Sequence, residues 1–136
     1  MSWKIGLKEV PVVVGLIERN KKLLIAKRPD HKIYKGYWEF PGGKIEENES
    51  VEAALYRELK EELAIDVKKA HSCFIHTHPY ANQKVLLHIW LVSSFYGEPK
   101  PQESQVLLWI ELNELHSIPL LEGNLAIVDK ICDLFN

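Results

Sequence analysis

The sequence predicts an α/β fold in which helices pack as a sandwich on a sheet of mostly antiparallel strands. Short β-branched and apolar runs recur along the chain, one amphipathic helical pattern lies in the middle, and a second ends the sequence. The length of 136 residues, with 46% hydrophobic and 26% charged residues, is typical of one globular domain, expected to span residues 1–136.

Three strands are expected in the first part of the chain. Residues 10–18 are apolar and β-branched, and residues 23–27 follow them after a polar turn, so the two runs should form a hairpin. A polar loop over residues 29–36 leads to a short aromatic strand at residues 37–40. Pro41, Gly42 and Gly43 are expected to stop that strand.

A helix is predicted from the N-cap Ser50 to about Leu63. At 100° per residue, its apolar side chains form one stripe that should face the core. The expected members of this stripe are Val51, Leu55, Tyr56, Leu59 and Leu63.

The rest of the chain should supply three more strands and a terminal helix. Strands are expected at residues 67–77 and 84–95, joined by a turn at 79–82, and at residues 105–110 after the break at 97–101. Residues 124–135 read as one amphipathic helix. Its apolar face would carry Leu125, Val128, Ile131, Cys132 and Phe135.

Charge and composition exclude several classes of function. The net charge of −2 and the scattered cations do not favour a nucleic acid polymer as partner. The apolar run at residues 10–17 is far shorter than the roughly 20 residues of a membrane span, and no leader pattern precedes it. Cys73 and Cys132 have no metal-ligand spacing and are expected to be free, buried thiols. We therefore expect a cytoplasmic protein that is a monomer.

Three glutamates in the predicted central helix point to metal chemistry. Glu58, Glu61 and Glu62 lie at i, i+3 and i+4, so their side chains project over one sector of the helix. Hard cations such as Mg²⁺ bind carboxylate oxygens together with substrate phosphates. A solvated acidic face would explain the three residues alone equally simply.

The wider spacing decides between these interpretations. From Gly43, the segment GGKIEENESVEAALYRELKEELAI reads G-x5-E-x7-R-E-L-x-E-E-x-A-I, which resembles the Nudix box G-x5-E-x7-R-E-U-x-E-E-x-G-U, where U is a bulky aliphatic residue. One position departs, Ala64 in place of glycine. A left-handed backbone there would cost alanine about 1–2 kcal/mol.

This resemblance implies an α/β/α sandwich with a mixed, largely antiparallel sheet and a pyrophosphohydrolase that uses Mg²⁺, with Mn²⁺ as a substitute. It implies that Arg57 pairs with Glu49, besides an i, i+4 pair with Glu61. Glu58 is assigned as the base. The implied metal ligands are Gly42, Glu58, Glu61, Glu62 and Glu103, and the implied catalytic residues are Arg57 together with these four glutamates.

The segments WEFPGGKIE and IWLVSSFYGEP are similar to the MutT-like branch of the superfamily, whose members hydrolyse oxidised purine nucleotides such as 8-oxo-dGTP and so protect DNA from mutation. Asn124 would read the base edge, although a helix N-cap is an alternative for it. Gln83 stands where that branch can carry a base-contacting arginine. The implied substrate-binding residues are Arg28, Glu39, Phe40, Pro41, Gly42, Lys44 and Asn124.

Other substrates and roles stay open from the sequence. A pyrimidine triphosphate or an ADP-ribose compound would suit the same box, and a non-catalytic nucleotide sensor could share the fold. His76 and His78 alternate on one expected strand face but lack a third ligand for Zn²⁺, so they are expected to be ordinary side chains.

Overall fold

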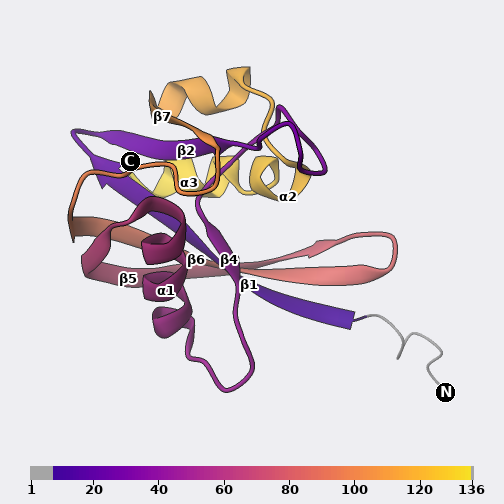
Figure 1. Cartoon of the computed structure of the whole chain (residues 1–136). Helices are drawn as coiled ribbons and strands as arrows, with labels where there is room; N and C mark the ends of the chain where they lie inside the picture. Colours follow the sequence, from indigo (N-terminus) through magenta and orange to yellow (C-terminus); the bar gives the residue numbers. More distant parts are fainter. Residues whose placement is uncertain (1–7, 136) are drawn as a thin grey trace, which may run out of the picture.

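The computed structural model describes residues 8–135, and the remaining residues of the predicted domain, 1–7 and 136, lie outside the described part. Within it, seven strands form one sheet in the order β3-β2-β1-β6-β5, with β4 paired to β1 and β7 paired to β2. Helix α1 lies on one face of the sheet, and α2 and α3 lie on the other (Figure 1).

The predicted first hairpin is present. Strands β1 (Lys8–Arg19) and β2 (Lys22–Lys27) are antiparallel, and β3 (Trp38–Glu39) continues the sheet beside β2. The two turn residues, Asn20 and Lys21, both have positive φ, of 53° and 64°. Two left-handed residues are what a tight two-residue hairpin turn requires.

A parallel pair makes the sheet mixed. Strands β5 (Asp66–Pro79) and β6 (Gln83–Tyr96) form the predicted long hairpin, and β6 runs parallel to β1 from Lys8↔Gln83 to Ile17↔Val92. Strand β7 (Val106–Glu111) pairs antiparallel with β2. The predicted fold class, an α/β/α sandwich with a mixed, largely antiparallel sheet, is confirmed.

The segment of residues 41–43 ends β3 as predicted, but it also leads into a strand that the sequence did not predict. Gly42–Lys44 form strand β4, which pairs with β1 through Val14↔Gly42 and Val12↔Lys44. A Cβ atom at Gly42 would overlap the carbonyl oxygen of Val13, so only glycine allows the two backbones to approach this closely. Because the partner strand lies far upstream, no local pattern indicates the pairing.

Strand β1 separates two hydrophobic cores. Val14 and Leu16 point into a core shared with α3, whereas Val13 and Ile17 point into a core shared with α1. Successive residues of a strand face opposite sides of the sheet, so a strand buried on both faces must be apolar throughout. This explains the continuous apolar run in the sequence.

Helix α1 (Val51–Leu63) begins as predicted, because the Ser50 hydroxyl accepts a hydrogen bond of 3.0 Å from the Ala53 amide. The stripe prediction is wrong at Tyr56, which is 40% exposed, whereas Ala54 is fully buried. Ala54 belongs to the core between α1 and the sheet.

The end of α1 shows how the alanine in the motif is accommodated. Ala64 has φ 59° and ψ 33°, a left-handed conformation, and its amide donates a 3.0 Å hydrogen bond to the Lys60 carbonyl. Alanine therefore adopts the backbone that glycine would occupy at lower cost.

We expect Ala64→Gly to stabilise the protein by about 1 kcal/mol, because glycine adopts the left-handed backbone without strain. The larger conformational entropy of glycine in the unfolded chain offsets only part of this gain. The corresponding rise in melting temperature is roughly 3–5 °C. Thermal unfolding of the two proteins checks this, with Ala53→Gly, inside the same helix, as a control that should lower the melting temperature.

The predicted terminal helix is interrupted, so one continuous helix over 124–135 is wrong. The 3-10 helix η2 (Leu112–Ser117) precedes α2 (Glu122–Leu125) and α3 (Val128–Leu134). Ile127, between α2 and α3, is fully buried, whereas Leu125 is 49% exposed. Ile127, Val128 and Ile131 belong to one core, and Leu125 lies outside it.

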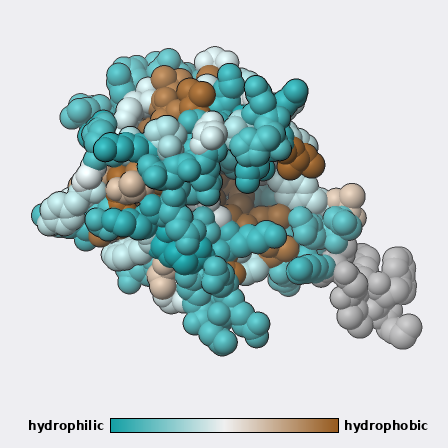
Figure 2. Space-filling view, in the orientation of Figure 1, coloured by the Kyte–Doolittle hydropathy of each residue, from teal (hydrophilic) through white to brown (hydrophobic). Residues whose placement is uncertain are grey.

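The surface of the described residues is mostly hydrophilic, with small hydrophobic patches, one of them over β7 and η2 at the top of the view (Figure 2). Val106 and Leu108 are exposed there. None of the described helices combines the length and apolar character needed to cross a membrane. Cys73 and Cys132 are free thiols that are partly buried.

Candidate active site

An acidic recess lies where the end of β2, the β3–β4 segment, the end of α1 and the loop before β7 meet. Its volume is about 220 Å³. We call it the acidic recess, and the lining residues used below are Arg28, Lys32, Glu39, Gly42, Glu62 and Glu103. Residues from four separate parts of the chain, most of them expected from the sequence, are therefore brought together.

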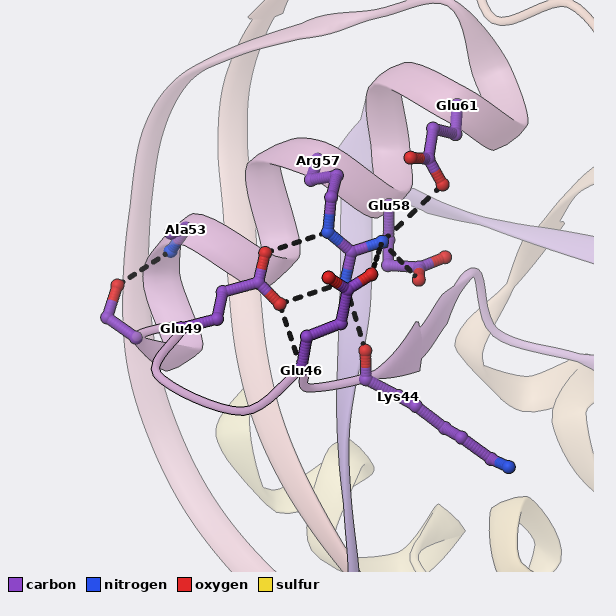
Figure 3. Close-up of polar contacts among 8 residues, drawn as sticks. Lys44, Glu46, Glu49, Ala53, Arg57, Glu58 and Glu61 are labelled. Atoms are coloured by element: carbon purple, nitrogen blue, oxygen red, sulfur yellow. Dashed lines mark hydrogen bonds and ion pairs between the residues drawn. The ribbon is translucent and has the colours of Figure 1, made fainter.

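Arg57 lies at the centre of a network of carboxylates beside this recess (Figure 3). Its Nε and Nη2 atoms donate to the two oxygens of Glu49, at 2.7 and 2.9 Å, as the sequence predicted. Nη2 also donates to the Lys44 carbonyl at 3.0 Å, and Nη1 donates to Glu58 Oε1 at 2.8 Å. The guanidinium therefore ties the loop after β4 to the acidic face of α1.

The carboxylates around Arg57 respond to it differently. The hydrogen bond from Arg57 lowers the pKa of Glu49 to about 2, with help from the Glu46 amide. Burial raises the pKa of Glu58 despite the opposing effect of Arg57. Glu61 lies 3.5 Å from Arg57 and is 57% exposed, so its predicted i, i+4 pair with Arg57 is present as a long, exposed contact.

Glu62 is the most desolvated acid of the motif. Its Oε2 atom accepts a 3.0 Å hydrogen bond from the Gly42 amide. Burial raises its pKa to about 9, and the negative charge of Glu58 adds to the shift. A carboxyl group that stays neutral at pH 7 without a cation is well suited to gain from binding one.

Glu103 reaches the recess because its loop is fastened to the end of α1. The Gln102 amide and the Gln105 side chain both donate to the Glu62 carbonyl, at 3.0 and 3.1 Å. The Gln105 side-chain oxygen in turn accepts from the Glu103 amide at 2.8 Å. Gln105 is a positioning residue that the sequence analysis missed, since only tertiary contacts distinguish it from any loop glutamine.

The carboxylates in and beside the recess fit a divalent cation; Glu62 and Glu103 line the recess, whereas Glu58 and Glu61 lie outside its lining. Glu58, Glu62 and Glu103 repel one another, and each neighbouring charge raises the pKa of Glu62 further. Within residues 8–135, no three acidic, histidine or cysteine side chains are already arranged as a metal site. Glu58 and Glu61 are turned to Arg57, and Glu62 is turned to Gly42. Hard carboxylate oxygens with unrelieved repulsion are the ligands that Mg²⁺ prefers.

Arg28 and Glu39 form an ion pair at the opposite wall of the recess. Arg28 Nη1 lies 3.1 and 3.0 Å from the two oxygens of Glu39, and its Nε donates to the Ile33 carbonyl at 2.8 Å. Burial raises the pKa of Glu39, and the positive charge of Arg28 opposes this. The guanidinium thus holds the loop of residues 29–36 against β3.

The remaining predicted residues occupy different positions. Phe40 is buried, and its amide donates a 2.9 Å hydrogen bond to Asn124 Oδ1. Asn124 lies inside α2, whose N-cap is Leu121, so the alternative of a helix N-cap is wrong. Pro41 lines the acidic recess, whereas Lys44 lines another recess together with Glu46 and Glu49.

A second hollow adjoins the acidic recess. Its volume is about 580 Å³, and Arg28 lines both spaces. We call it the tyrosine hollow, and its lining includes Tyr34, Tyr37, Tyr80, Gln83, Leu121 and Glu122. The sequence analysis noted Gln83 but missed the tyrosines. Their clustering in the two loops at 34–37 and 80–82 is a signal that could have found them.

The two histidines of β5 lie behind this hollow. Their ring centroids are 5.9 Å apart, and His78 Nε2 lies 2.8 Å from Glu122 Oε1. The His78 ring also packs edge-on against Tyr80, at 5.0 Å between centroids. These contacts attach the tip of the β5–β6 hairpin to α2.

The family model of the NUDIX domain matches residues 12–130, which is nearly the whole of the described chain. The chain belongs to the Nudix family. As a member it is a pyrophosphohydrolase that acts on small nucleotides, and the family generally uses divalent metal ions. The predicted MutT-like branch is also confirmed by the relatives below.

Relatives that are named for two different activities resemble the chain. A CTP pyrophosphohydrolase of Escherichia coli is 36% identical over 94% of this Nudix chain and 95% of its own length. An 8-oxo-dGTP diphosphatase of the same bacterium is 30% identical over 92% of the chain and 98% of its own length.

Solved structures agree with the fold. The solution structure of the E. coli ORF135 protein has a TM-score of 0.84 and 35% identity, with 94% of this chain and 91% of that chain covered. A structure described for MutT from Aliivibrio salmonicida and Vibrio cholerae has a TM-score of 0.76 and 33% identity, with 91% and 97% covered.

Proposed function

We propose that this Nudix protein hydrolyses nucleoside triphosphates to a monophosphate and pyrophosphate, with Mg²⁺, or Mn²⁺ in its place, bound in the acidic recess. The observation that carries the proposal is the junction of two unlike spaces at Arg28. One is lined by acids suited to a metal and phosphates, and the other by tyrosines suited to a base and sugar. A nucleotide with a phosphate chain matches both at once.

Glu58, Glu61, Glu62 and Glu103 would hold the cation, with the Gly42 backbone beside them. A bound Mg²⁺ would supply neutralisation of phosphate charge and a lower pKa for the attacking water. Glu58 is our candidate for the base. Its Oε1 is fixed by Arg57, and burial raises its pKa, which makes its other oxygen a better proton acceptor than an ordinary carboxylate.

The identity of the nucleobase is a separate question, and different observations support two classes of substrate. An 8-oxo-purine triphosphate is supported by the MutT-like motifs and by the relatives named 8-oxo-dGTP diphosphatase. Hydrolysis of that substrate would clear an oxidised nucleotide from the pool and prevent mutation. A cytidine triphosphate is supported by the CTP pyrophosphohydrolase relative and by Gln83 and Glu122 in the tyrosine hollow, since a carboxylate accepts well from an exocyclic amine.

Pyrophosphate release over a panel of nucleotides tests both the reaction and the base. We expect Mg²⁺-dependent conversion of a triphosphate to its monophosphate, with kcat/KM highest for 8-oxo-dGTP or for a cytidine triphosphate among 8-oxo-dGTP, dGTP, CTP, dCTP, UTP and ADP-ribose. Release of single phosphates, or turnover of ADP-ribose alone, would contradict the proposal.

Asn124 separates base recognition from a purely structural role. We expect Asn124→Asp to keep the acceptor for the Phe40 amide and hence the melting temperature, but to change the ratio of kcat/KM for 8-oxo-dGTP over dGTP several-fold. Asn124→Ala leaves the Phe40 amide without its acceptor and should also destabilise the fold by about 1–3 kcal/mol. If both variants keep the wild-type substrate ratio, Asn124 serves only to hold β3.

A further inference from the structure

The cations at the acidic recess are not equally available to a phosphate chain. Arg28 directs Nη1 to both oxygens of Glu39 and Nε to the Ile33 carbonyl. Three of its five N–H groups are therefore used within the protein. Its positive charge is also largely offset by a carboxylate 3.0 Å away.

Lys44 does not fill this gap. Lys44 lines a separate recess and not the acidic one, its backbone carbonyl is bound to Arg57, and its side chain extends away from the carboxylates around Arg57 (Figure 3). In the described structure, the ammonium group of this lysine is thus directed elsewhere, although the sequence predicts it as a substrate-binding residue.

Lys32 is the remaining cation of the acidic recess. It lines that recess together with Glu62 and Glu103, and its positive charge lowers the pKa of Glu39, which also lines the recess. Among the described residues, no ion pair within 4.0 Å and no side-chain hydrogen bond engages the Lys32 ammonium. It does not line the tyrosine hollow, so it lies toward the end of the site away from the base.

We propose that Lys32 binds the distal phosphates of the substrate, those that leave as pyrophosphate, and that Arg28 is mainly a positioning residue for the loop of residues 29–36. This inference rests on the proposed function, because it assigns a role within the same site. An ammonium on a flexible stem can follow a phosphate through the reaction, whereas the bound guanidinium is fixed. Arg28, which lines both spaces, lies nearer the phosphate attached to the sugar.

The test compares Lys32→Ala and Lys32→Arg with Lys35→Ala. The Lys35 variant also loses one positive charge from the same loop, but Lys35 lines neither the acidic recess nor the tyrosine hollow. For a triphosphate turned over by the wild type, we expect Lys32→Ala to raise KM about fivefold or more with a much smaller change in kcat. Lys32→Arg should restore most of the affinity, and Lys35→Ala should match the wild type.

Product binding gives a readout without turnover. By calorimetry in Mg²⁺, inorganic pyrophosphate should bind Lys32→Ala at least about fivefold more weakly than the wild type, while the nucleoside monophosphate should bind both equally. Unchanged pyrophosphate affinity, or equal effects of the Lys32 and Lys35 variants, would overturn the inference while leaving the proposed function intact. If the wild type releases pyrophosphate from no triphosphate, the proposed function fails, and the pyrophosphate titration still decides whether Lys32 forms an anion site.

Discussion

Glu62→Gln is expected to lower kcat by about 10³-fold or more and at the same time to raise the melting temperature of the metal-free protein. The amide keeps the shape of the side chain and an oxygen that can accept from the Gly42 amide. It cannot supply the negative charge that a metal requires. It also removes the cost of ionising a buried acid beside Glu58.

The pH dependence of this stability gain has a definite sign. The pKa of Glu62 is raised from 4.5 to about 9, so folding disfavours its charged form. The wild type therefore loses stability relative to Glu62→Gln as the pH rises from about 4.5 towards 9, and the gap should close at acid pH. At alkaline pH we expect the variant to melt at least roughly 3 °C higher in EDTA.

Melting curves with EDTA and with Mg²⁺, taken beside kcat, check both halves of this prediction. Mg²⁺ should raise the melting temperature of the wild type much more than that of the variant. Glu52→Gln, in the first turn of α1 and outside the acidic recess, is the control and should keep wild-type activity. A variant with near-normal kcat would remove Glu62 from the metal ligands.

Arg57→Lys is expected to cost about 1–3 kcal/mol of stability and to reduce kcat/KM by about 10- to 100-fold. One ammonium cannot bind both oxygens of Glu49, the Lys44 carbonyl and Glu58 together. The loop after β4 would then be held less firmly against α1, and Glu58 would lose the contact that orients it.

The matched control is Glu46→Ala, which removes an exposed pair with Arg57 at 3.6 Å. Exposed pairs contribute little, so this variant should behave as the wild type in both assays. Unfolding curves in urea and kcat/KM for one triphosphate measure the two effects. Equal behaviour of Arg57→Lys and Glu46→Ala would mean that the Arg57 network does not orient the site.

Local patterns predicted the parts of the fold that depend on near neighbours. Ser50 caps α1 as expected, and the apolar repeat of Leu55, Leu59 and Leu63 faces the core. The pair of Arg57 with Glu49 was implied by the resemblance to the Nudix box. These features join residues within one helix or one adjoining loop, where spacing in sequence fixes distance in space.

Features that depend on distant segments could not be predicted in this way. Gly42 carries no side-chain signal for β4, because its pairing with Val14 is decided by how closely two backbones approach. No glycine or proline marks the break between α2 and α3, which falls at Ala126 and Ile127. Gln105 could not be recognised either, because its partner is the carbonyl at the end of α1.

The tyrosine hollow is built from the loop at residues 29–36, the tip of the β5–β6 hairpin and the start of α2, whereas the acids of α1 are anchored by β4 and Arg57. The tip residues Ala81 and Asn82 form no part of either hydrophobic core. Substitutions there can therefore accumulate without disturbing hydrolysis. With the base placed in the tyrosine hollow as we propose, exchanging the hairpin tip would alter base preference and leave the phosphate chemistry unchanged.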